Sequence, residues 1–78
     1  MNEITATEIR QTLNLPYSTI NHYTNLGLFS VVRKSGNKRI YNFNEVKARY
    51  SMIMKLTQEG YPLSLIQRKV GDYINELL

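Results

Sequence analysis

The sequence predicts a small, mainly α-helical domain that contains one short β-hairpin. Three observations lead to this fold class. Start and stop signals for helices recur along the chain, two runs of β-branched and aromatic residues meet at the turn-forming residues 35–37, and 78 residues leave room for only one core. We therefore expect two helices, a hairpin and two further helices, in that order.

The composition excludes several classes of protein. The chain has no cysteine and a single histidine, His22, so disulfides and thiolate metal sites are excluded. No apolar run approaches the roughly 20 residues that span a bilayer, and the acidic start does not resemble a signal peptide. No pair of carboxylates, nucleophile with a base or glycine-rich phosphate loop stands at a useful spacing. We expect a cytoplasmic protein that is not an enzyme and needs no metal or cofactor.

The first helix is expected to start near residue 6. The run Thr5–Glu8 fits a capping box, and Ile4 and Ile9 occupy the two positions of a hydrophobic staple. Asn14 follows as a residue that can take the left-handed conformation with which many helices end. These signals bound a short helix on both sides.

A second helix of about ten residues is expected directly afterwards. Pro16 stands where a first helical turn tolerates proline, and Gly27 stands where a C′ residue belongs. The short spacing between the two helices is typical of a helix-turn-helix. One face of the second helix carries short, uncharged side chains at helical spacing: Ser18, Asn21, His22 and Asn25. Such a face suits base edges in a groove, and an ordinary solvated face is the alternative interpretation.

The hairpin region carries the positive charge of the chain. Residues 33–49 contain six bases against Glu45 alone, a local charge of +5 in a chain whose net charge is +4. A localised basic patch is the electrostatic footprint of a protein that binds a polyanion. Taken alone, however, a run of charges is more often an ordinary solvated surface.

A longer third helix is expected after the hairpin. Asn44 is predicted to be its N-cap, and Gly60 stands at its end. Met52 and Met54 are predicted to fill gaps in the core, because the flexible methionine side chain suits that role.

A fourth, short helix is expected in the run "YPLSLIQRKV", with Leu63, Ile66 and Val70 facing inward. Asp72 is predicted to be the N-cap of a further helix. We therefore predict that the domain comprises residues 1–71 and that residues 72–78 start a further C-terminal helix.

The order helix, turn, helix, wing, helix, helix resembles the DNA-binding domain of the MerR family of bacterial transcription regulators. The run "TATEIRQTLNLPYSTINHYTNLGLF" is similar to that family's opening helix-turn-helix, "KRIYNFNEV" to its wing strand, and "LTQEGYPLSLIQ" to the passage between its third and fourth helices. The similarity covers nearly the whole chain. It implies a winged helix-turn-helix fold and sequence-specific binding of double-stranded DNA, with the second helix in the major groove and the wing on phosphates.

The resemblance also implies which residues bind DNA. The family's base-reading helix corresponds to residues 17–25, and its wing contacts fall within residues 34–41. The candidate DNA-binding residues are Tyr17, Ser18, Thr19, Asn21, His22, Tyr23, Lys34, Lys38, Arg39 and Tyr41. Many relatives carry basic residues at the positions of Ser18 and Asn21, so their preferred bases cannot be transferred to this chain.

The same resemblance leads to an expectation about assembly. Typical members continue into a long antiparallel dimerisation helix, of which residues 72–78 would be the start. We expect a homodimer on DNA or through a longer C-terminal helix. The free chain should be mainly monomeric, because the apolar face of Ile74, Leu77 and Leu78 is too short for a stable interface.

Two other functions stay open at this point. One is an architectural DNA-binding protein of the excisionase or segregation type, which would line up along repeated sites. The other is a protein interaction module that uses Tyr17, Tyr61 and Tyr73 as contact aromatics, and it would show no salt-sensitive affinity for DNA.

Overall fold

The computed structural model describes the backbone of residues 2–77 and the side chains of residues 2–71. The elements follow in the order β1 (Glu3–Thr5), α1 (Ala6–Leu13), α2 (Tyr17–Asn25), β2 (Val31–Ser35), β3 (Lys38–Asn42), α3 (Phe43–Gln58) and α4 (Leu63–Leu77). The described part of the chain is mostly helical, with a small antiparallel sheet, as predicted. None of its helices is long and apolar enough to cross a membrane.

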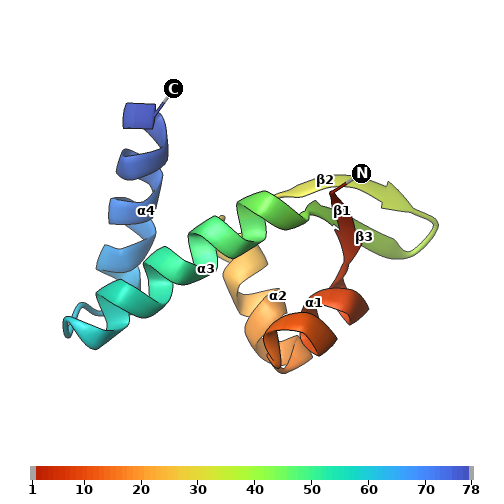
Figure 1. Ribbon diagram of the computed structural model, residues 1–78, viewed down its shortest axis with the longest axis horizontal. Coiled ribbons are helices and arrows are strands. Elements are labelled where there is room, and N and C mark those ends of the chain that lie inside the picture. Colours follow the sequence, from red (N-terminus) through yellow and green to blue (C-terminus); the bar gives the residue numbers. More distant parts are fainter. Residues whose placement is uncertain (1, 78) are drawn as a thin grey trace.

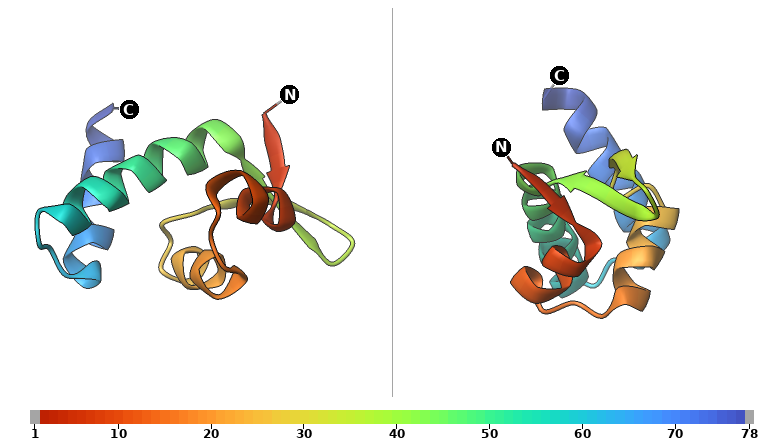
Figure 2. Two further views of the ribbon diagram at one scale, coloured as in Figure 1. Left: turned by 60° about the horizontal axis from the view of Figure 1, so that its bottom comes forward. Right: turned by 90° about the vertical axis from the view of Figure 1, so that its right-hand side faces the viewer.

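The long helix α3 connects the two ends of the molecule. The sheet lies at its N-terminal end, α4 lies at its C-terminal end, and α1 and α2 pack together beside it (Figure 1). The left view in Figure 2 shows the hairpin of β2 and β3 projecting beyond the helices. We call these two strands and their turn, residues 31–42, the hairpin.

The capping signals of α1 are confirmed. The Thr5 hydroxyl accepts a hydrogen bond from the backbone N–H of Glu8, and the Glu8 carboxylate accepts one from the backbone N–H of Thr5, so two N–H groups without helical partners are satisfied. Asn14 ends the helix with φ of 55°, in the left-handed conformation.

Helix α2 has the expected extent, with one difference at its start. Pro16 is the N-cap rather than a residue of the first turn, and its carbonyl accepts hydrogen bonds from the N–H groups of Thr19 and Ile20. At the other end, Gly27 has φ of 79° and the N–H of Leu28 donates to the carbonyl of Tyr23. A positive φ at this place explains why a glycine follows the helix.

The sheet has one strand more than predicted. β1 pairs with β3, which also pairs with β2, so the strand order is β1-β3-β2 and both pairs are antiparallel. Because Ser35 lies opposite Lys38, the turn of the hairpin consists of Gly36 and Asn37 alone, with φ of 61° at Gly36.

Two predicted caps are wrong. The N-cap of α3 is Asn42, whose side-chain oxygen accepts from the N–H of Glu45, and Asn44 lies inside the helix. Asp72 also lies inside a helix, because α4 runs without a break from Leu63 to Leu77.

The core is a single cluster to which every helix and the sheet contribute. Its buried members are Ile4, Ile9, Ile20, Leu28, Phe29, Tyr41, Val46, Ile53, Leu56, Ile66 and Val70. Met52 packs against this cluster, whereas Met54 is 38% exposed, so the prediction for Met54 is wrong. The side chains of Ile74, Leu77 and Leu78, for which we predicted an apolar face, lie outside those that the structure describes.

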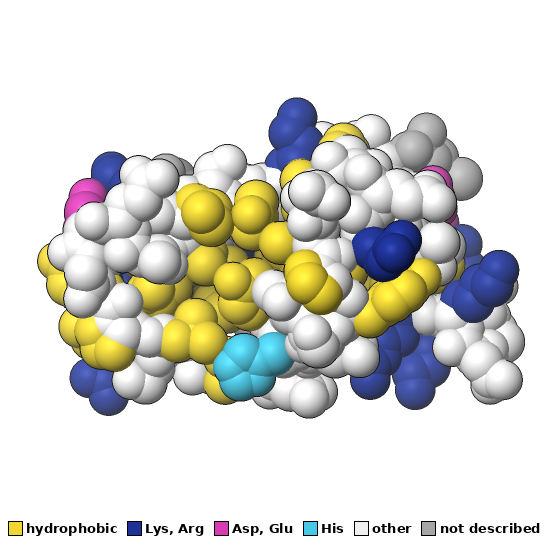
Figure 3. Space-filling model, turned by 90° about the horizontal axis from the view of Figure 1, so that it is seen from below, with side chains coloured by type: hydrophobic (Ala, Val, Ile, Leu, Met, Phe, Trp, Pro, Cys, Tyr) yellow, Lys and Arg dark blue, Asp and Glu magenta, His cyan; other side chains and the backbone are white. Residues whose placement is uncertain are grey.

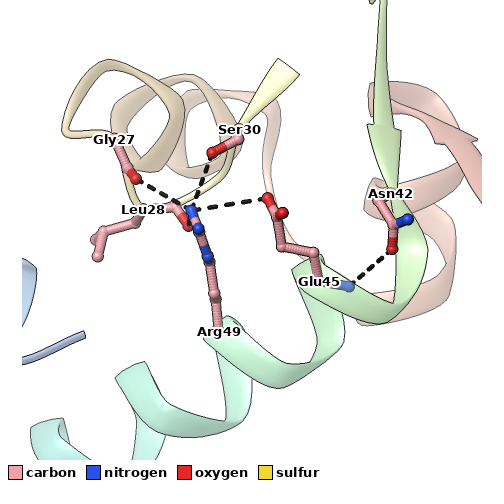
Figure 4. Close-up of polar contacts among 6 residues, drawn as sticks. All are labelled: Gly27, Leu28, Ser30, Asn42, Glu45 and Arg49. Carbon is pink, nitrogen blue, oxygen red and sulfur yellow. Dashed lines mark hydrogen bonds and ion pairs between the residues drawn. The ribbon is translucent and has the colours of Figure 1, made fainter. Parts of the chain in front are cut away.

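Arg49 fastens α3 to the segment between α2 and β2 (Figure 4). One terminal nitrogen of its guanidinium, Nη1, donates to the carbonyls of Gly27 and Leu28 and to the hydroxyl of Ser30, over 3.0 to 3.3 Å. The same nitrogen lies 3.7 Å from Oε1 of Glu45, which has no hydrogen-bond partner among the described residues. Arg49 is therefore a structural residue, and its charge is directed into the molecule.

An ion pair covers the outer face of the sheet. The side chains of Ile40 and Tyr41 lie on opposite faces of β3, because successive residues of a strand alternate between its faces. Ile40 is nevertheless only 7% exposed. Glu3 on β1 and Arg33 on β2 meet nearby, with Nη2 of Arg33 2.7 Å from Oε1 of Glu3, and both border a shallow hollow with Ile40. The pair also lowers the pKa of the Glu3 carboxyl, chiefly through the hydrogen bond from Arg33.

Replacing Arg49 should destabilise the fold. In Arg49→Met the apolar stem is kept, but two loop carbonyls and Glu45 lose their cationic partner, which should lower the free energy of unfolding by about 2 to 3 kcal/mol. Urea unfolding measures the change. Lys55→Met is the control on the same helix, because Lys55 is exposed, and it should have little effect. Equal stability of the two variants would contradict the assigned role of Arg49.

The Glu3–Arg33 pair should be visible as a pH effect. Because the folded-state pKa of Glu3 lies below its ordinary value of 4.5, the stabilisation is present above that pH and is lost as the pH falls through the folded-state pKa. In Arg33→Gln the Glu3 pKa should rise toward its ordinary value. An NMR titration of the carboxyl carbon measures it, and an unchanged pKa would show that the pair does not persist in solution.

Candidate nucleic-acid interface

Two side-chain contacts join β3 to one face of α2. Arg39 and Tyr41 are two residues apart on the strand and therefore lie on the same side of it, while Asn21 and Thr24 are one helical turn apart on α2. Nη1 of Arg39 lies 3.4 Å from Oδ1 of Asn21, and the hydroxyls of Tyr41 and Thr24 are 2.9 Å apart. The hairpin and α2 are thus held in a fixed register.

Tyr41 is part of the core and not of the surface. Its side chain is 0% exposed, its hydroxyl is bonded to Thr24, and its ring lies edge-on to Phe29 with centroids 6.5 Å apart. The prediction that Tyr41 contacts DNA is wrong, because a fully buried side chain cannot reach a phosphate. The sequence pattern assigned Tyr41 to the second strand of the hairpin correctly, but it did not show which side of the strand faces the core.

Tyr23 is half-buried beside the same aromatic cluster. Its ring packs edge-on against Phe29 at 5.4 Å, and burial, with a smaller contribution from Tyr50, raises the pKa of its hydroxyl. Only part of this side chain is available to a partner, and it stays a predicted contact.

The outward face of α2 is polar, uncharged and accessible. Tyr17 is 45% exposed, Thr19 is partly buried, and the remaining predicted members of this face are exposed: Ser18, Asn21, His22 and Asn25. The structure therefore places the predicted residues of α2, apart from Tyr23 and Thr19, on one open surface.

The hairpin charges divide into two kinds. Arg33 is exposed, but its guanidinium is paired with the Glu3 carboxylate, and Arg49, which follows in α3, is bonded to loop carbonyls. Lys34 and Lys38 are exposed, and Arg39 is partly buried against Asn21. In Figure 3 the Lys and Arg side chains gather toward the side of the molecule on which the hairpin projects. The local excess of positive charge thus comes from fewer residues than the sequence count indicates.

A shallow cleft lies where the hairpin, α1 and α2 meet. Its volume is about 260 Å³, and it is lined by Thr5, Ala6, Thr7, Asn21, Asn37, Lys38 and Arg39. The lining has two cationic side chains and no acidic one, so the cleft favours an anion. The sequence offered no sign that the start of α1 would border the predicted site.

Arg10 is a further cation at this surface that the sequence pattern did not indicate. Its guanidinium carbon lies 5.4 Å from the centre of the Tyr17 ring, and the Tyr17 hydroxyl is 2.9 Å from the hydroxyl of Thr7. These contacts fix Arg10 beside the N-terminal end of α2. Residues 1–32 carry Arg10 against Glu3 and Glu8, so the charge of this part of the chain is slightly negative and does not indicate a cationic contact.

Comparison with known proteins agrees with the resemblance seen in the sequence. Residues 4–71, from β1 into α4, match the family model described as MerR HTH family regulatory protein. Searches of the curated proteins and of the solved structures return no match. The matched residues make up most of the chain and extend over the sheet and all or part of each of the helices α1 to α4. The chain therefore belongs to the MerR HTH family of regulatory proteins, a family of DNA-binding transcription regulators.

Proposed function

We propose that the protein is a transcription regulator that binds double-stranded DNA sequence-specifically, with α2 in the major groove and the hairpin acting as a wing on the adjacent phosphates. The observation that carries this proposal is the fixed register between an uncharged polar helix face and a cationic hairpin. Its place of action would be the cytoplasm, where bacterial DNA lies.

The different side chains on α2 and on the hairpin support this proposal. Bases are read by short hydrogen-bonding side chains that can approach their edges, whereas phosphates are held by cations that carry no sequence information. The exposed face of α2 offers the first kind and no charged residue. Lys34, Lys38 and Arg39 of the hairpin offer the second kind, and Arg10 adds a cation at the start of α2.

The protein interaction alternative is less well supported, because the aromatics on which it depends have partners within the chain. Tyr17 is bonded to Thr7 and lies under Arg10. Tyr61 packs against the core, with the ammonium of Lys69 4.7 Å from the centre of its ring. The side chain of Tyr73 lies outside the described ones. The two described aromatics of that hypothesis, Tyr17 and Tyr61, are thus both in contact with side chains of the chain itself.

Binding to duplex DNA should depend steeply on salt. With roughly three to four phosphates neutralised, the logarithm of the affinity should fall against the logarithm of salt concentration with a slope of about −3 to −4. Fluorescence anisotropy with a labelled duplex at several salt concentrations measures the slope. An affinity that does not change with salt, or no binding to any duplex, would contradict the proposal.

Lys38 and Arg33 should behave differently, although both are hairpin cations. Lys38→Gln removes an outward charge and should weaken binding to all duplexes about equally, with a slope reduced by about one. The double change Arg33→Gln and Glu3→Gln removes a mutually neutralising ion pair at constant net charge, and the slope should stay as it is. If the double variant lost as much slope as Lys38→Gln, Arg33 would have to leave Glu3 and contact DNA.

A further inference from the structure

Tyr17, the first residue of α2, is held by two side chains of α1. Its hydroxyl is 2.9 Å from the hydroxyl of Thr7, and the guanidinium carbon of Arg10 lies 5.4 Å from the centre of its ring. Thr7 and Arg10 are three residues apart and therefore lie on the same face of α1. The Tyr17 ring thus has a hydrogen-bond partner at its hydroxyl and a cation over its face.

The Arg10 guanidinium is available to an anion. Arg10 is exposed, and no ion pair of it is found among the described residues. The nearby carboxylate of Glu8 is bonded within the capping box, and the first turn of α2 contains no acidic residue. A cation is attracted to the face of a ring without donating its N–H groups in hydrogen bonds, so the five donors of the guanidinium stay free.

The place of Arg10 suits a phosphate contact in the proposed complex. Ser18 follows Tyr17 directly and begins the run of short polar side chains on the exposed face of α2. When that face lies against base edges in the groove, a cation beside the first residue of α2 lies next to the phosphates that border the groove. Because Arg10 belongs to α1, this contact would be independent of the hairpin.

The contact with Tyr17 matters because an exposed arginine side chain is flexible. Ordering such a side chain when DNA binds costs conformational entropy, which weakens the affinity. A ring that already holds the guanidinium removes part of this cost before DNA arrives. The strength of a cation–ring contact at an exposed site corresponds to a factor of about two to five in a binding constant.

We propose that Arg10 binds a DNA phosphate beside the start of α2, and that Tyr17 is a positioning residue that directs the Arg10 guanidinium to it instead of contacting DNA itself. The sequence resemblance alone implied a direct contact of Tyr17 with DNA. This inference rests on the proposed function, because it assigns roles to two residues at the same interface.

The experiment is a double-mutant cycle that comprises the wild type, Arg10→Gln, Tyr17→Leu and the variant with both changes. Each protein is titrated by fluorescence anisotropy, at several salt concentrations, with the duplex that the wild type enriches most from a randomised library. Circular dichroism confirms that each variant is folded, which we expect because both side chains are exposed.

The two single variants should differ in kind. Arg10→Gln should weaken binding to the enriched duplex and to unrelated duplexes alike, with a salt slope reduced by about one. Tyr17→Leu should weaken binding about two- to fivefold when Arg10 is present. When Arg10→Gln is already in place, Tyr17→Leu should have no further effect, since the two residues act through one contact.

Tyr17→Phe is the matched control. It removes the hydroxyl and its hydrogen bond with Thr7 but keeps the ring under the guanidinium, so it should bind DNA like the wild type. A tyrosine that contacted DNA through its hydroxyl would instead lose affinity in Tyr17→Phe, whether or not Arg10 is present.

The inference is overturned if Arg10→Gln leaves the affinity and the salt slope unchanged, or if Tyr17→Leu has no effect in the presence of Arg10. It is also overturned if Tyr17→Leu weakens binding equally with and without Arg10, or if Tyr17→Phe weakens it as much as Tyr17→Leu. These results would leave the proposed function in place, because they require an enriched duplex. A wild-type protein that enriches no duplex would overturn the proposed function itself.

Discussion

The hydrogen bond between Tyr41 and Thr24 is the contact on which the arrangement of the interface depends. A buried hydroxyl pair contributes only about 1 kcal/mol, and each aromatic contact of Phe29 adds a similar amount at most. Their importance lies in position. Since Tyr41 is fixed in the core beside α2, Arg39, two residues earlier on the same side of β3, is brought to Asn21 one turn earlier on the helix. The hairpin cannot tilt away from α2 without exposing Tyr41.

Arg49 supports the same arrangement from the other side. The segment between α2 and β2 carries backbone carbonyls that no sheet or helix satisfies, and the guanidinium of Arg49 on α3 binds two of them, with Glu45 nearby. A residue that sequence counting assigns to a basic patch thus holds the hairpin to the helical body. The contacts of Arg49 also show why the net charge of a sequence segment does not by itself predict the charge of the surface that the segment forms. Opposite charges and carbonyls that neutralise a base can come from any part of the chain.

Much of the fold could be predicted because its signals are local. The capping box of Thr5, the left-handed Asn14 and the glycine after α2 each depend on a few neighbouring residues, and all three appear as expected. The features that were missed depend on distant ones. The strand β1 exists only because it pairs with β3, and pairing that continues to Asn42 makes that asparagine the cap of α3 in place of Asn44. Likewise, the local sequence predicts neither the burial of Tyr41 nor the contact between Arg10 and Tyr17.

The most direct test of the proposed interface is NMR chemical-shift mapping of the amides with a short duplex added at low salt. We expect the largest changes within α2, the hairpin turn and the start of α1, with small changes along α3 beyond Arg49. Large changes confined to the far ends of α3 and α4, with α2 and the hairpin unaffected, would contradict it.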